Sequence, residues 1–365
     1  MARVMSDPVA LDKHTPEPIP SQEPRLGKTA SGITHLRMSA GHSRDLESQL
    51  TLPLGSWRLQ DIDWGFVFKS QHYGTPLTTI AILIALLVVH WTLTPSKRVF
   101  FLYDASISYI SHGDTIPAWV AVVVPLISLL ISLVAYEFVI FRSFNLHITN
   151  AVATTVHFFV DCVCSFVTVE FITELTKMLI GRLRPNFLQE CFGGQQQLEG
   201  VWRSSSPVQL GSSLVNDIDC PSPLSMASRK SFPSGHSSCS AVIMTYNIVF
   251  LLWAGYMRAD GASFMGLRRQ TGWRGGHRFL REIGHGFYLF WILVQAAFVW
   301  AVGVSRFADN KHQVSDVVGG WLLGTCFALI YSCRATSLHQ YVVMHNVAAR
   351  DRESQINGRF RAMPT

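Results

Sequence analysis

Residues 77–94 read LTTIAILIALLVVHWTLT, eighteen positions without an Asp, Glu, Lys or Arg. About 20 apolar residues in a helix are enough to cross the roughly 30 Å hydrocarbon core of a bilayer. Comparable segments recur along the chain. We expect six spans, at residues of about 77–94, 117–140, 151–178, 236–257, 284–304 and 314–333. The sequence therefore predicts an all-α, polytopic membrane protein built as a six-helix bundle.

The composition agrees with this class of protein. Of the 365 residues, 48% are hydrophobic and 15% are charged, and the mean hydropathy is +0.25. Soluble proteins carry about 25% charged residues. The net charge of +6 comes from basic residues scattered through several loops rather than gathered in one stripe. We therefore expect no nucleic-acid partner.

Both ends of the chain read as polar tails. Residues 1–70 mix Pro, Ser, His and charges without an apolar period, which predicts a disordered N-terminal tail. We expect the six-span domain at residues 71–335 and a C-terminal tail at 336–365. Twenty Lys and Arg residues lie on the side of the tails and ten on the other side, so the positive-inside rule predicts cytoplasmic termini.

The third expected span ends in Lys177-Met-Leu-Ile-Gly-Arg-Leu-Arg184-Pro185. Lys177 and Arg184 are two helical turns apart, so both can face one side of a helix. Pro185 is expected to end that helix. Two cations on one face can bind an anion, although snorkelling side chains at the membrane interface are the simpler alternative.

Residues 232–236, Phe-Pro-Ser-Gly-His, come directly before the fourth span. A Pro-Ser-Gly turn that leads into a helix presents free backbone N–H groups and the positive end of the helix dipole, which together favour anion binding. Gly235 would let a phosphate approach closely. The alternative is an ordinary N-cap, Ser234, followed by an interfacial histidine, His236.

Residues 305–316, SRFADNKHQVSD, join the fifth and sixth spans. His312 and Asp316 are four residues apart, so in a helical segment Asp316 can accept a hydrogen bond from one ring nitrogen and leave the other nitrogen free to attack. The alternative is a loop salt bridge.

The expected topology places these three motifs on one membrane face, opposite the termini. Phosphoryl transfer requires mainly charge stabilisation and positioning, and Arg side chains fit phosphate oxygens. We therefore expect a phosphate-handling active site at the extracytoplasmic face of the membrane.

In these residues the chain resembles the type 2 phosphatidic acid phosphatase superfamily and, within it, the lipid phosphate phosphatase family. The pattern K-x6-RP, PSGH and SR-x5-H-x3-D is complete, and the flanks GRLRPNFLQEC and KHQVSDVVGG are also similar. The resemblance covers about residues 70–335. It implies an enzyme that hydrolyses lipid phosphates such as phosphatidate and lysophosphatidate, without a metal ion or any other cofactor.

The resemblance also implies a role for each matching residue. The phosphate-binding residues would be Lys177, Arg184, Ser234, Gly235 and Arg306. His312 would be the nucleophile that forms a phosphohistidine, oriented by Asp316. His236 would protonate the leaving alkoxide.

Several alternatives stay open. The motifs recognise phosphate rather than lipid, so sphingoid-base phosphates and isoprenoid diphosphates are alternative substrates, and an alcohol could replace water as the acceptor. A non-catalytic membrane scaffold of the same fold is a further hypothesis. A transporter is another, because Asp161, Glu170 and Glu174 lie in the third span, although a charge network along that helix is simpler.

The membrane is either the plasma membrane or an internal one, and the oligomeric state is open. Cys191 and Cys220 share one polar loop. A disulfide between them is a hypothesis that depends on the orientation, because an oxidising compartment favours disulfides.

Overall fold

The computed structural model describes residues 62–101, 104–144, 148–193, 200, 214–215, 225–258 and 278–361. Six helices are long and apolar enough to cross a membrane. They are α3 (Gly74–Thr92), α4 (Ala118–Phe144), α5 (Ile148–Ile180), α9 (Gly235–Leu252), α11 (Arg278–Ala308) and α12 (Val314–Arg361). This confirms the prediction of an all-α bundle with six spans, and the chain is a multi-pass integral membrane protein.

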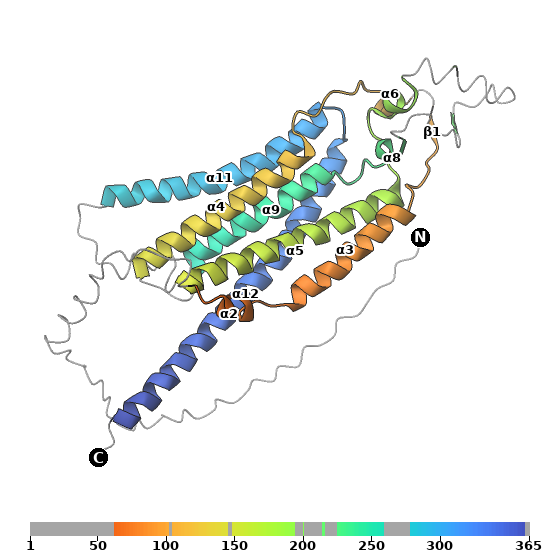
Figure 1. The fold of residues 1–365 in the computed structure, drawn as a ribbon. Coiled ribbons are helices and arrows are strands. Elements are labelled where there is room, and N and C mark those ends of the chain that lie inside the picture. The colour runs from red at the N-terminus through yellow and green to blue at the C-terminus, as the bar shows by residue number, and fades with distance from the viewer. Residues whose placement is uncertain are drawn as a thin grey trace, which may run out of the picture. The chain divides into compact units, whose positions relative to one another are not determined.

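Short elements connect the long helices. They are α2 (Trp64–Lys69), the 3-10 turn η2 (Ala105–Ile107), α6 (Phe187–Phe192), α8 (Ser225–Ser228) and the π-helical turn η3 (Trp253–Met257), which continues α9. Strands β1 (Phe100–Phe101) and β2 (Leu214–Val215) form one antiparallel pair. Figure 1 shows α6, α8 and β1 beyond the same end of the long helices.

The helix ends differ from the expected spans mainly in length. Residues 336–361, expected as a polar tail, continue α12 as a helix. Within the expected tail of residues 1–70, residues 1–61 lie outside the described residues. Residues 64–69 form α2, whose Val67 packs with Ile62 against Ala153 of α5.

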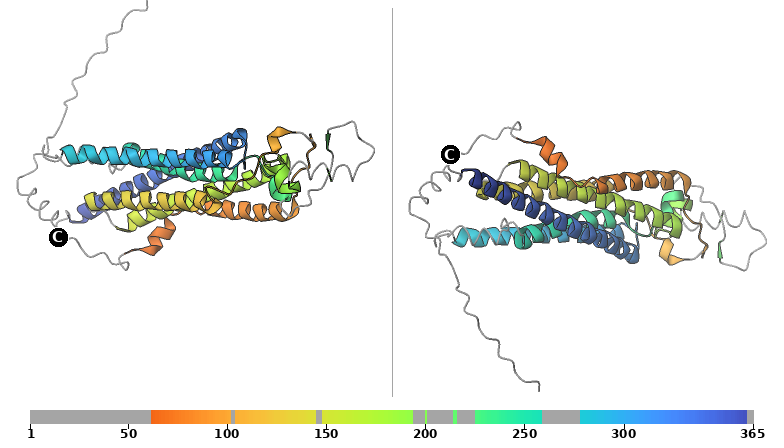
Figure 2. Two further views of the ribbon diagram at one scale, coloured as in Figure 1. Left: turned by 90° about the horizontal axis from the view of Figure 1, so that it is seen from above. Right: turned by 90° about the horizontal axis from the view of Figure 1, so that it is seen from below.

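Helix α9 is the central helix of the bundle. It contacts α4, α5, α11 and α12, and Figures 1 and 2 show it running beside them. Small residues allow the close approach of α12: a Cβ added to Gly324 would lie 2.5 Å from the Ser238 carbonyl oxygen, and one added to Gly320 would lie 2.6 Å from that of Ser234. This packing holds the first turns of α9 and α12 together.

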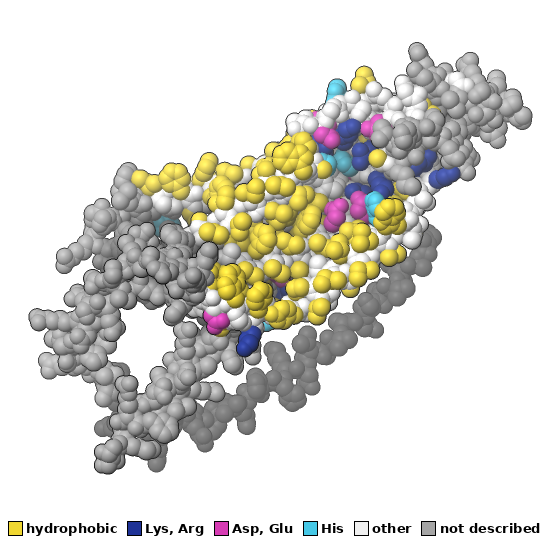
Figure 3. All heavy atoms as spheres, in the orientation of Figure 1, with side chains coloured by type: hydrophobic (Ala, Val, Ile, Leu, Met, Phe, Trp, Pro, Cys, Tyr) yellow, Lys and Arg dark blue, Asp and Glu magenta, His cyan; other side chains and the backbone are white. Residues whose placement is uncertain are grey.

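The outer helices expose apolar side chains where lipid is expected. Leu77, Ile84 and Trp91 on α3 and Trp119 and Ile131 on α4 are all exposed. Figure 3 shows apolar side chains over the middle of the visible face, with charged and histidine side chains gathered toward the end where α5 stops and α9 begins. Burial of such apolar surface in lipid stabilises a membrane protein and leaves the charged end at the interface.

Candidate active site

The structure brings the three motifs together at one end of the bundle. The Ser234 backbone N–H donates to the Asp316 carbonyl oxygen at 3.0 Å, and His236 Nε2 lies 3.4 Å from Arg306 Nη1. A Cβ added to Gly235 would lie 3.0 Å from Lys177 Nζ, so a side chain at position 235 would crowd the lysine. The motifs therefore share one site although up to 139 residues separate their members (316 minus 177).

Helix α5 ends at Ile180, before Pro185, the residue that was expected to end it. Gly181 has a φ of +59°, a left-handed conformation that glycine adopts without strain. A Cβ there would lie 1.9 Å from the Ser96 carbonyl oxygen. The prediction that Pro185 ends the helix, with Lys177 and Arg184 on one helical face, is therefore wrong: Lys177 is on the last turn and Arg184 is in the extended segment that follows.

Lys177 is held by a carboxylate on its own helix. Its Nζ lies 2.6 Å from Glu174 Oε1, and Lys230 Nζ lies 3.4 Å from Glu174 Oε2. One carboxylate thus serves two ammonium groups, which leaves net positive charge beside Gly235. The other acidic residues of α5 are also engaged, since Asp161 pairs with Arg334 and Glu170 accepts a hydrogen bond from the Cys239 thiol. These contacts agree with a charge network.

Arg184 has no ion pair or side-chain hydrogen bond within the described residues. Its backbone N–H donates to the Ser228 carbonyl at 3.0 Å, but its buried Nε has no hydrogen-bond partner within the described part of the chain. Burial lowers the pKa of the guanidinium, while the carboxylates of Glu190 and Asp114 raise it. Because an arginine stays protonated in proteins, this is a partly buried cation, with a buried Nε, that is suited to an anionic ligand.

His312 is oriented by a backbone carbonyl. Its Nδ1 lies 2.8 Å from the Ser231 carbonyl oxygen, whereas Asp316 Oδ2 is 3.8 Å away, too far for a hydrogen bond. The expected hydrogen bond from the ring to Asp316 is therefore not formed. Since a carbonyl only accepts, Nδ1 carries the proton and Nε2 has the free lone pair. Burial lowers the pKa of His312, although Asp316 opposes this, so neutral imidazole is favoured.

Asp316 and His312 both contact Ser231. The carboxylate accepts hydrogen bonds from the Ser231 hydroxyl at 2.6 Å, from Arg182 Nη1 at 2.7 Å and from the Gln313 N–H at 3.0 Å. Neither Ser231 nor Arg182 was among the site residues predicted from the sequence. Arg182 lies inside the first motif, which was a signal for it. Ser231 contacts His312 with its backbone carbonyl, a group that every residue has, so the sequence contains no signal for it.

Arg306 is almost fully buried, and each of its guanidinium nitrogens has a partner. Its Nη2 donates to Asp309 Oδ2 at 2.8 Å and to the Ile116 carbonyl at 2.9 Å, and its Nη1 donates to Asp114 Oδ1 at 2.8 Å. Nε donates to the Ser305 hydroxyl at 3.3 Å. The arginine lies beside His236 but is strongly engaged by protein groups.

The start of α9 offers donors next to these cations. Ser234 is the N-cap, and its hydroxyl accepts from the Ser237 hydroxyl at 3.1 Å. The Ser234 N–H is taken by the Asp316 carbonyl. In the described part of the molecule, the N–H groups of residues 235–237 have no acceptor, so they remain available to an anion.

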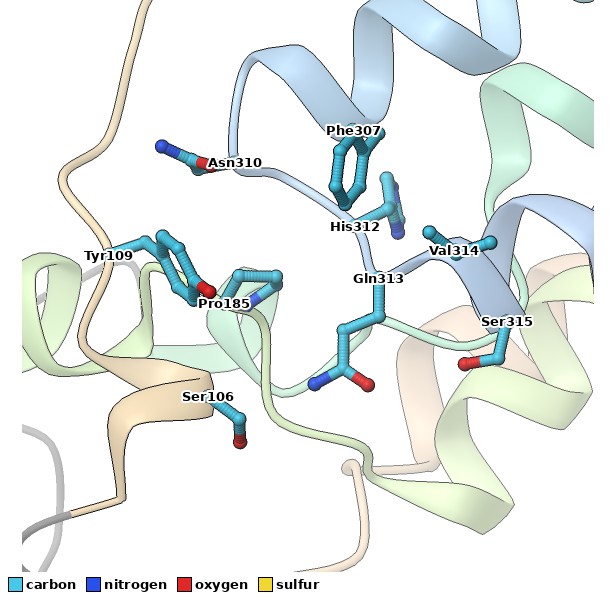
Figure 4. Close-up of a pocket in the computed structure, with 9 residues that line it drawn as sticks. All are labelled: Ser106, Tyr109, Pro185, Phe307, Asn310, His312, Gln313, Val314 and Ser315. Carbon is cyan, nitrogen blue, oxygen red and sulfur yellow. The ribbon is translucent and has the colours of Figure 1, made fainter.

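A pocket of about 380 Å³ adjoins the site at His312. Figure 4 shows Ser106 and Tyr109, from the segment before α4, on one side of the pocket, and Gln313, from the α11–α12 connection, and Ser315, at the start of α12, on the other. None of Lys177, Arg184 or Arg306 lines it. The pocket therefore borders the cation cluster, with which it shares His312.

Cys191 on α6 is disulfide-bonded. Its sulfur lies 3.4 Å from the Ser228 hydroxyl oxygen. Cys220 lies outside the described residues, so its pairing with Cys191 stays a prediction. The free cysteines in the described ranges are Cys162, Cys164, Cys239, Cys326 and Cys333.

Comparisons with known proteins agree with the motifs. The model of the PAP2 superfamily matches residues 158–338. "Phospholipid phosphatase 2" of Homo sapiens is 30% identical over 244 residues, which cover 66% of this chain and 73% of that protein. The Bos taurus protein of the same name is 30% identical over 263 residues, covering 69% and 79%.

A "Putative phosphatidate phosphatase" of Drosophila melanogaster is 27% identical over 272 residues, or 67% of this chain. The match spans 63% of the Drosophila protein, somewhat less than two thirds of its length. No solved structure has a significant match to the chain.

Proposed function

This chain belongs to the PAP2 superfamily, in its lipid phosphate phosphatase family, and we propose that it hydrolyses lipid phosphate monoesters through a phosphohistidine, without a metal ion. The single observation that carries the proposal is the pairing of a partly buried cation, which has no partner among the described residues, with an oriented, neutral imidazole. Arg184 supplies the first and His312 the second.

Phosphate binding would use the positive groups around Gly235. We assign this role to Lys177, Arg184, Arg306 and the N–H groups at the start of α9, with Ser234 and Gly235 shaping the turn. Arg184 can bind phosphate oxygens without breaking an existing hydrogen bond. Lys177 contributes charge that Glu174 neutralises only in part, because that carboxylate is shared with Lys230.

In the first chemical step, His312 Nε2 attacks phosphorus, the N–P bond forms and the P–O bond to the lipid breaks. His236 donates a proton to the departing alkoxide. The imidazole gains positive charge, which the Ser231 carbonyl stabilises at Nδ1, with the Asp316 carboxylate close behind. Such oriented dipoles are a common source of transition-state stabilisation.

In the second step, water attacks the phosphohistidine, and His236 accepts a proton from it. The N–P bond breaks, which releases inorganic phosphate and restores His312. The same histidine thus acts as acid and then as base.

The proposed substrates are phosphatidate, lysophosphatidate or related lipid phosphates. The names of the relatives support this class, and so do the exposed apolar helices beside the site. Sphingoid-base phosphates and isoprenoid diphosphates remain competing substrates.

We further propose that the termini are cytoplasmic and that the site faces the lumen or the outside. The distribution of Lys and Arg supports this orientation. The disulfide at Cys191, at the site end of the molecule, supports it independently, since disulfides persist in oxidising compartments.

The test is phosphate release from phosphatidate in mixed micelles containing EDTA. We expect wild-type turnover to survive the chelator and His312→Ala to lose at least about 10³-fold, because the nucleophile is gone. His285→Ala, on α11 near its start and far from the motifs, is the matched histidine control and should keep full activity. Chelator-sensitive turnover, or near-normal turnover of His312→Ala, would refute the mechanism. A fully inactive wild type across a panel of lipid phosphates would favour a scaffold.

A further inference from the structure

Two carboxylates bind the Arg306 guanidinium, and they differ in how firmly they are held. Asp309 has a side chain that is 5% exposed. Its two oxygens accept from the Thr115 N–H at 2.9 Å and the Thr115 hydroxyl at 2.5 Å. Asp309 is therefore a fixed part of the arginine's surroundings.

Asp114 is held much more loosely. Its side chain is 49% exposed, and among the described residues its carboxylate has a hydrogen bond only to Arg306. An exposed carboxylate with one hydrogen-bond partner costs less to move than a buried carboxylate with several. Of the Arg306 contacts to charged groups, the one to Asp114 is thus the easier to exchange.

The position of Asp114 overlaps the proposed phosphate site. The Arg306 Nη1 that it binds is also the atom 3.4 Å from His236 Nε2. Its charge also acts on Arg184, the unpartnered cation. A carboxylate that binds one phosphate-binding arginine, and the nitrogen of it that faces the proposed acid, takes up a hydrogen-bonding position that a phosphate oxygen could use.

We propose that the Asp114 carboxylate competes with phosphate for Arg306, so that the substrate binds this arginine only by displacing it. The inference rests on the proposed function of the site. Asp114 would return to Arg306 as the product leaves, and the carboxylate would repel the dianion of inorganic phosphate. It would thereby weaken product binding and favour release.

The segment that carries Asp114 is anchored on both sides. The Tyr109 N–H donates to the Pro185 carbonyl at 2.9 Å, and Thr115 is bound to Asp309. Displacement therefore requires rotation of one exposed side chain rather than release of the whole segment. This favours rapid exchange between the carboxylate and phosphate.

The variant that tests this is Asp114→Asn, which keeps the size of the side chain and removes its charge. The readout is the inhibition constant for inorganic phosphate in phosphatidate hydrolysis by the purified full chain. We expect this constant to fall about tenfold, with a lower KM for phosphatidate, since charge pairs of this kind contribute strongly to binding. Asp114→Glu, which restores the charge, should return the constant toward the wild-type value.

Asp104→Asn is the control on the same segment. The Asp104 carboxylate accepts from the Ser106 N–H at 2.8 Å and does not touch Arg306, so this variant should bind phosphate like the wild type. If Asp114 instead serves only to hold Arg306 in place, Asp114→Asn will bind phosphate more weakly or equally, and either outcome overturns the proposal.

A second readout separates this inference from the proposed function. The rise in melting temperature caused by inorganic phosphate reports binding without turnover, and we expect a larger rise for Asp114→Asn than for the wild type. An inactive wild type would refute the proposed function, but the phosphate-induced rise in melting temperature could still be measured. If the wild type is active and the rise for Asp114→Asn is equal or smaller, only the inference about Asp114 is refuted.

Discussion

Both ends of the helix bundle bury charged side chains, but the described residues pair them differently. At the end remote from the motifs, Arg258 Nη1 lies 2.6 Å from Glu137 Oε1, with both side chains 5% exposed. Asp161 binds Arg334 and accepts from the Tyr246 hydroxyl. At the site end, Arg184 has no such partner. Removing a charge from water without giving it a partner costs free energy, so the unpaired, partly buried cation indicates a ligand, whereas the paired charges stabilise the fold.

The sharpest way to test the comparison is Arg184→Ala. We expect kcat/KM to fall about 10³-fold, as for the loss of a transition-state donor, while the melting temperature stays equal or rises, because a desolvated charge is removed. Phosphate release and thermal unfolding in detergent would check both parts. A variant that is strongly destabilised would show that Arg184 has a structural role.

The opposite end should respond in the opposite way. Glu137→Ala leaves Arg258 buried without its carboxylate, and we expect a loss of about 3–5 kcal/mol in the free energy of unfolding. The activity per folded molecule should stay near the wild-type value, since the pair is remote from the motifs. Thermal unfolding and single-turnover phosphate release would measure the two effects. An unchanged melting temperature would show that the Arg258–Glu137 pair does not stabilise the fold.

The smallest expected effect concerns pH. Burial holds the pKa of His312 below its ordinary 6.5, so His312 should stay neutral from pH 6.5 down to its lower folded pKa, and the enzyme should lose activity only as the pH falls through that pKa. The unfolded chain takes up the proton first, so His312 also lowers the free energy of unfolding as the pH falls below 6.5. A pH profile of kcat/KM with an acid limb centred at or above 6.5 would contradict this.

Much of the architecture could be predicted from the sequence, because span length and apolar composition determine which segments cross a membrane. The grouping of the three motifs followed from the alternation of spans. The end of α5 could not be predicted so well: Pro185 was the obvious terminator, but Gly181 ends the helix where Ser96 approaches it. Asp114 was missed because its contact with Arg306 crosses 192 positions (306 minus 114) and no motif contains it.

Ser231 contacts His312, the proposed nucleophile, and the neighbouring carboxylate of Asp316 with different parts of one residue. The hydroxyl serves Asp316, and the carbonyl serves His312. Every amino acid supplies a carbonyl at that position, so replacing the side chain removes one contact and keeps the other. The His312 tautomer is thus determined by a backbone carbonyl, which a substitution of the Ser231 side chain does not remove. We therefore expect variants at position 231 to keep the His312 proton on Nδ1.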